Sequence, residues 1–158
     1  MSISENNLKS LTRQTKVVSC VINFPCKSSK LYNLSAYNLP KFADDLERCS
    51  FLYAFIIHDR DINDNGEIKT VHIHLYLCSD KRHQLKYYIY LLSDLLNINE
   101  ELISVRVSNS DAGDIQYLVH KNNKEKFQYN VDDIKTNIPK DMFEEMMNRK
   151  IINTFSVV

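Results

Sequence analysis

Apolar and polar residues alternate along several short stretches of the chain, in the pattern typical of β-strands. Alternation or β-branched enrichment predicts strands over residues 17–24, 51–58, 68–78 and 102–107. Pro25 ends the first strand, and Asp64-Asn65-Gly66 supplies a turn between the second and the third. The pattern therefore predicts an antiparallel sheet that contains a hairpin.

Apolar residues recur at helical spacing in three other stretches. They predict helices from Pro40 onward, over residues 81–97, and over residues 112–121 with Asp111 as the cap. The order strand, helix, strand, strand, helix, strand is that of the split βαβ, or ferredoxin-like, α+β fold. In that fold the helices pack on one face of an antiparallel sheet, and we expect the other face to be free.

The length of the chain bounds its organisation. A chain of 158 residues suits one domain with a real core. We expect a flexible N-terminal arm over residues 1–15 and the folded domain over residues 16–135. The acidic, amphipathic stretch that follows predicts a C-terminal helix or linker over residues 136–158.

Composition adds limits rather than a function. Lys plus Arg total 20 and Asp plus Glu total 20, so a nucleic-acid partner would have to meet a local basic patch. The four cysteines show no CxxC spacing, and the sequence contains neither a secretory signal nor an apolar run of about 18 residues. We therefore expect reduced thiols, a cytoplasmic location and no membrane partner.

Histidines gather where the predicted hairpin strands meet. His72 and His74 are one residue apart on a strand, so they point to the same face while Ile73 points into the core. If the hairpin folds about Asn65-Gly66, His58 lies across from residue 72 or 73. Three imidazoles with a nearby carboxylate at one place on a sheet predict a metal site.

The third predicted helix supplies a candidate nucleophile. At about 100° per residue, Ile115, Leu118 and Val119 fall within one apolar arc. Tyr117 falls on the other side, with His120 and the lysines that follow it. A phenol among cations suits a residue that must meet a phosphate, because lysines attract the anion and stabilise a phenolate.

Three motifs, in this order, resemble those of the HUH endonucleases. They are His-Asp-Arg-Asp at residues 58–61, the His72-Ile73-His74 strand, and Tyr-Leu-Val-His-Lys-Asn-Asn-Lys-Glu-Lys-Phe-Gln-Tyr from Tyr117 onward. Within that superfamily the chain is most similar to the nuclease domain of RepB-type rolling-circle replication initiators (Rep) of small bacterial plasmids. The resemblance covers about residues 16–135. It implies a metal-dependent nickase and strand transferase that acts on single-stranded or supercoiled origin DNA in a bacterial cytoplasm.

The resemblance also implies residue roles. His58, Asp61, His72 and His74 would be the metal ligands, and Tyr117 would attack the phosphate to leave a 5′-phosphotyrosine link and a free 3′-hydroxyl. Three imidazoles and a carboxylate favour Mn²⁺, with Mg²⁺ as the alternative.

Several assignments stay open at this level. Asp59 lies two residues from Asp61 and either could reach the ion; we expect Asp61 and interpret Asp59 as a turn carboxylate. Candidate contacts to DNA are His120, Lys121, Lys124 and Lys126. A solvated charged stripe and a plain surface histidine explain those four residues about as well.

Other functions fit parts of the same pattern. A relaxase or a single-tyrosine transposase would share the metal site, so the DNA substrate would separate these enzymes from an initiator. A non-catalytic RRM-like module would stack bases on exposed strand aromatics, for which Tyr76 is a candidate. Initiators of this type usually continue into a helical oligomerisation domain, so we expect a homo-oligomer only if the native chain is longer.

Overall fold

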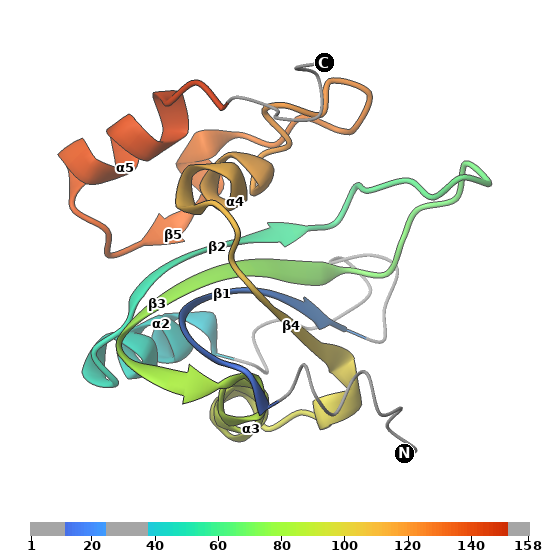
Figure 1. Ribbon diagram of the computed structural model, residues 1–158. Helices are drawn as coiled ribbons and strands as arrows, with labels where there is room; N and C mark the ends of the chain where they lie inside the picture. The colour runs from blue at the N-terminus through green and yellow to red at the C-terminus, as the bar shows by residue number, and fades with distance from the viewer. Residues whose placement is uncertain (1–11, 25–37, 152–158) are drawn as a thin grey trace.

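A five-stranded antiparallel sheet forms the centre of the molecule (Figure 1). The structure is a computed structural model that describes residues 12–24 and 38–151, so most of the predicted N-terminal arm and Pro25 lie outside the described residues. The strand order is β4-β1-β3-β2-β5. The strands are β1 (Gln14–Asn23), β2 (Leu52–His58), β3 (His72–Gln84), β4 (Ile103–Val107) and β5 (Lys135–Thr136). The predicted α+β, ferredoxin-like plan is confirmed.

Two helices cover one face of this sheet. They are α2 (Leu39–Arg48) and α3 (Leu85–Leu96). Their buried residues, such as Phe42 and Leu92, join the inward side chains of the strands in one apolar cluster. Ile73 and Leu75 of β3 belong to this cluster and are 0% and 1% exposed. This packed face fixes the position of the central strands.

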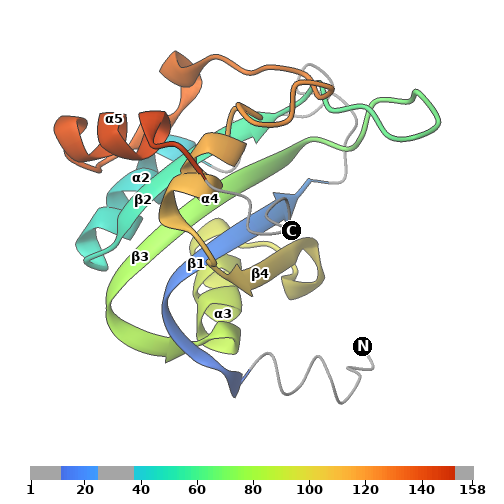
Figure 2. The same ribbon diagram turned by 45° about the horizontal axis from the view of Figure 1, so that its top comes forward.

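The opposite face is not free, contrary to the expectation from the sequence. Helices α4 (Asp111–Tyr117) and α5 (Lys140–Asn148) lie over β2 and β3 on that side (Figure 2). They bury Ala54, Ile56 and Tyr76 in a second apolar cluster. The cover is needed because the middle of this face is apolar, and exposing it to water would cost free energy.

Hydrogen bonds join α5 to α4. The side-chain amide of Gln116 donates to the carbonyl oxygens of Met146 and Arg149, at 2.9 Å and 2.8 Å. Met146 and Met147 are buried in the second apolar cluster. The C-terminal stretch therefore packs against the domain as far as Arg149. Among residues 12–24 and 38–151, no helix has the length and apolar character needed to cross a bilayer.

Several element boundaries differ from the sequence-based expectation, and β3 begins at His72 instead of residue 68. Residues 81–84 continue β3 instead of beginning α3, because Gln84 and His83 pair with Gln14 and Thr15 of β1. The same pairing starts β1 earlier than predicted. Strand β5 was not predicted, since two residues show no periodicity.

The helix that carries Tyr117 also differs at both ends. Ser110, not Asp111, is the N-cap, because its extended backbone lets the hydroxyl oxygen accept from the backbone N–H of Gly113 at 3.0 Å. The helix ends at Tyr117 instead of continuing to Lys121. Leu118 and Val119 nevertheless pack with Ile115 in the second apolar cluster, as the arc predicts, whereas His120 beyond them is buried.

Candidate metal centre and nucleophile

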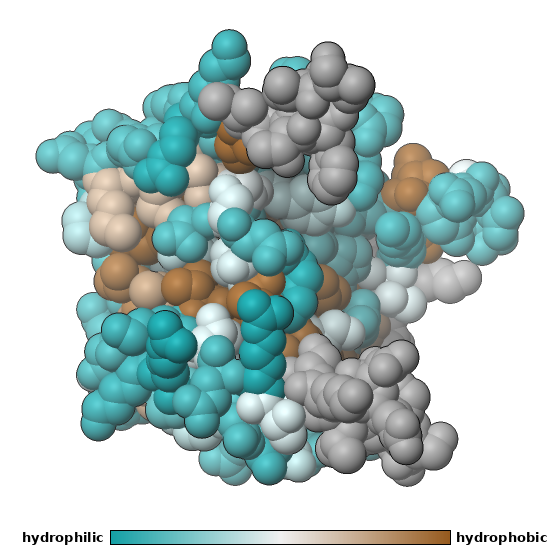
Figure 3. Space-filling model, in the orientation of Figure 1, coloured by the Kyte–Doolittle hydropathy of each residue, from teal (hydrophilic) through white to brown (hydrophobic). Residues whose placement is uncertain are grey.

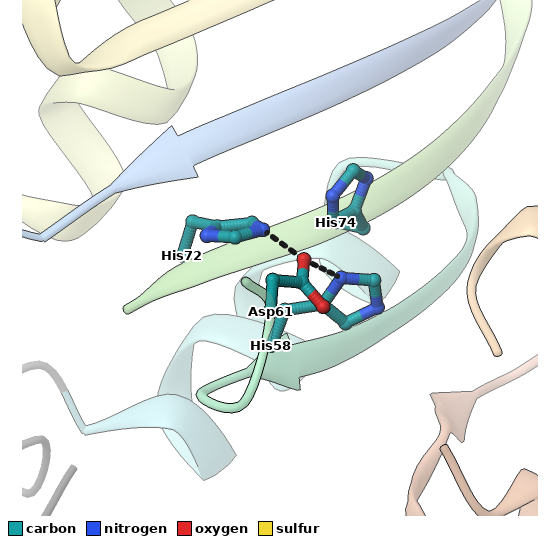
Figure 4. A group of neighbouring side chains, drawn as sticks. All are labelled: His58, Asp61, His72 and His74. Atoms are coloured by element: carbon teal, nitrogen blue, oxygen red, sulfur yellow. Dashed lines mark hydrogen bonds and ion pairs between the residues drawn. The ribbon is translucent and has the colours of Figure 1, made fainter. Parts of the chain in front are cut away.

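The β2–β3 hairpin brings the predicted metal ligands together (Figure 4). His58, the last residue of β2, pairs directly with His72, the first residue of β3. His74 follows two positions later on the same face. The ligand atoms of His58, Asp61, His72 and His74 all lie within 4.8 Å of one another.

The turn of the hairpin returns Asp61 to the strand ends. The backbone N–H of Lys69 donates to the Asp61 carbonyl at 2.8 Å. At the tip, the Asn63 side chain accepts from the N–H groups of Asn65 and Glu67, both at 3.0 Å. Gly66 has φ +79°, a left-handed conformation that glycine adopts without strain. The local sequence therefore fixes the path that places the Asp61 carboxylate.

Backbone carbonyls orient two of the imidazoles. His58 Nε2 lies 2.7 Å from the carbonyl oxygen of Leu118, and His72 Nδ1 lies 2.8 Å from that of Thr70. A carbonyl oxygen only accepts, so these two nitrogens carry the protons. The remaining nitrogens, His58 Nδ1 and His72 Nε2, each lie 3.0 Å from the same Asp61 oxygen, Oδ2. Second-partner hydrogen bonds of this kind are typical of metal-ligating histidines.

This donor set fits a divalent cation. Two nitrogen lone pairs and a carboxylate oxygen face one point, and they repel one another unless positive charge lies between them. The mixture of imidazole and carboxylate is one that divalent transition ions accept. The cluster could therefore hold a metal ion.

The pKa values of the cluster agree with a cation site. Burial raises the pKa of the Asp61 carboxyl, but contacts with the side chains of His58, His72 and Tyr129 outweigh burial and hold that pKa well below its usual range. Burial is the main cause that lowers the pKa of His74 to about 2. Asp61 is therefore anionic and His74 neutral near pH 7, as metal ligands must be.

The geometry separates the two candidate aspartates. Asp61 is 9% exposed, and its carboxylate lies within the histidine cluster. The Asp59 carboxylate instead lies 3.8 Å from the guanidinium of Arg60. The arrangement favours Asp61 over Asp59 as the ligand.

Tyr117 is beside this cluster. Its ring centroid lies 5.5 Å from that of His74, and the Lys126 ammonium donates to its hydroxyl oxygen at 2.6 Å. That hydrogen bond raises the pKa of Lys126, which keeps its positive charge next to the phenol. Tyr117, His72 and His74 line one cleft of about 980 Å³.

The other predicted DNA contacts do not form one surface: His120 is buried, Lys121 contacts α5 and Lys124 is exposed to solvent. His120 is 1% exposed and its Nδ1 donates to the carbonyl of Phe127 at 2.8 Å, so the surface-histidine interpretation is wrong. His120 has φ 58°, which turns its side chain inward just after the helix ends. Lys121 donates to the Met147 carbonyl of α5, whereas Lys124 is exposed to solvent.

One residue of the site was missed in the sequence analysis. The Tyr129 ring stacks on His58, with centroids 4.2 Å apart and planes 5° from parallel. Its hydroxyl donates to Asp61 Oδ1 at 2.9 Å and accepts from the backbone N–H of Arg60, also at 2.9 Å. Tyr129 is the last residue of the motif that begins at Tyr117, which was the available signal.

Comparison with known proteins identifies the class. The family described as "Plasmid replication protein, origin binding domain" matches residues 29–142, which is more than half of the chain. The chain therefore belongs to this family of plasmid replication proteins, and the resemblance to RepB-type initiators is confirmed.

Two curated relatives are similar over the same region. A "Replication protein" of Onion yellows phytoplasma (strain OY-M) is 30% identical over 112 residues, covering 62% of this chain and 28% of the relative. "Replication protein RepB" of Lactiplantibacillus plantarum is 30% identical over 114 residues, covering 71% of this chain and 50% of the relative. The chain thus spans half or less of the length of these relatives.

Proposed function

We propose that this plasmid replication protein nicks single-stranded DNA at a replication origin by metal-assisted attack of Tyr117. The product would be a 5′-phosphotyrosine link and a free 3′-hydroxyl that primes rolling-circle synthesis. One observation carries the proposal: Asp61, His72 and His74 line a cleft that also contains the Tyr117 phenol, and His58 Nδ1 faces the same Asp61 oxygen as His72 Nε2. A phosphate-activating centre and a nucleophile in one cleft suit a transesterification.

His58, Asp61, His72 and His74 would hold the ion, for which we favour Mn²⁺ over Mg²⁺ because three of the four ligands are imidazoles. When bound, a divalent ion supplies Lewis-acid polarisation of the scissile phosphate and neutralises developing charge. Tyr129 would position the ligands, since it contacts both the His58 ring and the Asp61 carboxylate.

The chain's own residues account for the transfer step. The Tyr117 oxygen forms a bond to phosphorus while the bond from phosphorus to the 3′-oxygen breaks. The Lys126 ammonium, hydrogen-bonded to the Tyr117 oxygen, stabilises the phenolate as its proton leaves to solvent. The departing 3′-oxygen takes up a proton and becomes the 3′-hydroxyl. Because one phosphoester replaces another, the reverse reaction can rejoin strands.

Two alternatives differ in how well the structure supports them. A relaxase or a single-tyrosine transposase would use the same centre, and the match to a plasmid origin-binding family favours the initiator. A non-catalytic RRM-like module needs exposed strand aromatics, but Tyr76 is 2% exposed beneath α4 and α5. A buried Tyr76 offers no surface on which a base could stack, which argues against the binding-only alternative.

The proposal is tested with single-stranded oligonucleotides tiled across a candidate origin, incubated with the protein and Mn²⁺. We expect a covalent protein–DNA adduct that survives denaturation, disappears with a chelator and is absent in Tyr117→Phe. Tyr90→Phe is the matched control, because Tyr90 is 54% exposed on α3, away from the cleft, and should keep the adduct. An adduct that persists in Tyr117→Phe would place the nucleophile elsewhere.

A further inference from the structure

The cleft beside the candidate metal centre has an apolar rim that the proposed chemistry does not use. Ile62, Ile68 and Phe127 line the same cleft as Tyr117 and the histidines. These residues are 62%, 50% and 40% exposed. A single exposed apolar side chain is ordinary, but three around one cleft indicate a contact surface.

Two of these side chains are held side by side on the β2–β3 hairpin. Ile62 and Ile68 form an antiparallel bridge beyond the ends of the two strands. The backbone N–H of Asn63 donates to the Glu67 carbonyl at 2.9 Å and closes the tip. The hairpin projects from the body of the molecule, and apolar atoms show on its surface (Figures 1 and 3). The isoleucine pair thus forms one wall of the cleft at a fixed position.

Phe127 lines the cleft from a different segment of the chain. The guanidinium of Arg60 lies 5.3 Å from its ring centroid, and the Tyr129 ring packs edge-on at 4.8 Å. Its carbonyl oxygen accepts from His120 Nδ1, which ties its backbone to the buried histidine cluster. The ring is therefore held in place and yet partly open to solvent, as a stacking surface must be.

Charge does not make this cleft attractive to a phosphate backbone. Its lining contains four carboxylates and two lysines, namely Asp61, Asp64, Glu67, Glu125, Lys69 and Lys126. One of the two ammonium groups, that of Lys126, is already hydrogen-bonded to the Tyr117 hydroxyl. Affinity for a strand in this cleft must therefore come largely from contacts other than those to its phosphates.

We propose that Ile62, Ile68 and Phe127 bind the nucleobases that flank the scissile phosphate, with one base stacked on Phe127. Every base has an apolar π-face, and stacking on an aromatic side chain strengthens binding without reading the sequence. Bases in a duplex are stacked on one another, so the surface selects a single strand. The inference rests on the proposed function, whose substrate it defines more closely.

The test compares two strands with equal numbers of phosphates. The full chain carrying Tyr117→Phe, without divalent metal, is titrated with a fluorescent oligothymidylate of about 15 nucleotides and with an abasic strand of the same length. We expect the oligothymidylate to bind about ten-fold more tightly. Adding Phe127→Ala should remove most of that preference and leave the affinity for the abasic strand unchanged.

Three further measurements make the result specific. Phe127→Tyr keeps a ring and should retain the preference, and so should Tyr87→Ala, which removes an aromatic ring that is also 40% exposed but lies on α3. The salt dependence should not change in Phe127→Ala, because stacking releases no counterions. Equal or undetectable affinity for the two strands, or an equal loss for both in Phe127→Ala, would overturn the inference. This test measures binding and not cleavage. If the base preference is found but the native chain forms no covalent adduct, the nicking proposal is wrong while the base-binding surface is supported.

Discussion

At the start of strand β3, alternating residues give the two faces of the strand different surroundings. Ile73 and Leu75 point into the cluster under α2 and α3, where they are 0% and 1% exposed among apolar side chains. His72 and His74 point to the other side, toward Asp61 and Tyr117. One strand therefore serves both the core and the candidate site.

The comparison shows how the fold separates stability from chemistry. On the core face, side chains are stabilised by burial and need no specific partner. On the site face, backbone carbonyls of Thr70 and Leu118 hold two imidazoles so that their lone pairs face one carboxylate. Substitutions one residue apart should therefore affect different properties of the protein.

The largest effect should follow loss of a ligand from the site face. We expect His74→Ala to lower the rate of adduct formation by about a thousand-fold, because an incomplete ligand set no longer stabilises charge on the phosphate. Its free energy of unfolding should change by less than about 1 kcal/mol. Single-turnover cleavage and urea denaturation measure the two effects, with His83→Ala as the control. A cleavage rate close to that of the native chain would break the distinction between the faces.

Substitution of Leu75, the next residue, should lower stability and leave metal binding unchanged. Leu75→Ala should lower the free energy of unfolding by about 3 kcal/mol, because it leaves a cavity in the apolar core. The molecules that stay folded should still bind Mn²⁺ normally. Urea denaturation and a metal titration check this, and Leu75→Ile should cost much less. A loss of metal affinity in folded Leu75→Ala protein would show that the faces are coupled.

Metal should stabilise the protein through the site face only. At a Mn²⁺ concentration of about 100 times Kd, the free energy of unfolding should rise by about 2.7 kcal/mol, since the ion binds the folded state. Denaturation with and without Mn²⁺ measures the change. The double variant His72→Gln, His74→Gln should not respond, and a similar rise in that variant would locate the ion elsewhere.

The smallest expected effect is a loss of Mn²⁺ affinity when the Tyr129 hydroxyl is removed. Tyr129→Phe keeps the ring that stacks on His58 but removes the hydroxyl that contacts Asp61. We expect Mn²⁺ affinity to fall about ten-fold, with cleavage restored at saturating Mn²⁺. A metal titration of this variant beside Tyr90→Phe provides the measurement. Unchanged affinity would mean that the hydroxyl does not position the ligand.

Local periodicity explains what could be predicted. The strand alternation and the Asn65-Gly66 turn place His58 opposite residue 72 or 73, and in the structure it pairs with His72. From the residues alone either Asp59 or Asp61 could reach the ion, and the resemblance implied Asp61. In the structure, the turn folds Asp61 back toward the strand ends. Within regular secondary structure, the spacing of residues along the sequence predicts which side chains lie on the same face.

The features that the sequence did not predict depend on residues outside regular secondary structure or on tertiary contacts. The burial of His120 depends on a left-handed residue just beyond a helix end, which helical spacing cannot anticipate. The role of Tyr129 depends on a contact with Asp61 across 68 positions of sequence. The cover over the second face depends on α5, whose docking is a tertiary contact.

The most direct test of the account is to count bound Mn²⁺ by electron paramagnetic resonance of the free ion. We predict one ion per chain for the native protein and for Leu75→Ile, and none for the double variant His72→Gln, His74→Gln under the same conditions. Retention of the ion in the double variant, or its absence from the native protein, would contradict the assignment of the histidine face as a metal centre.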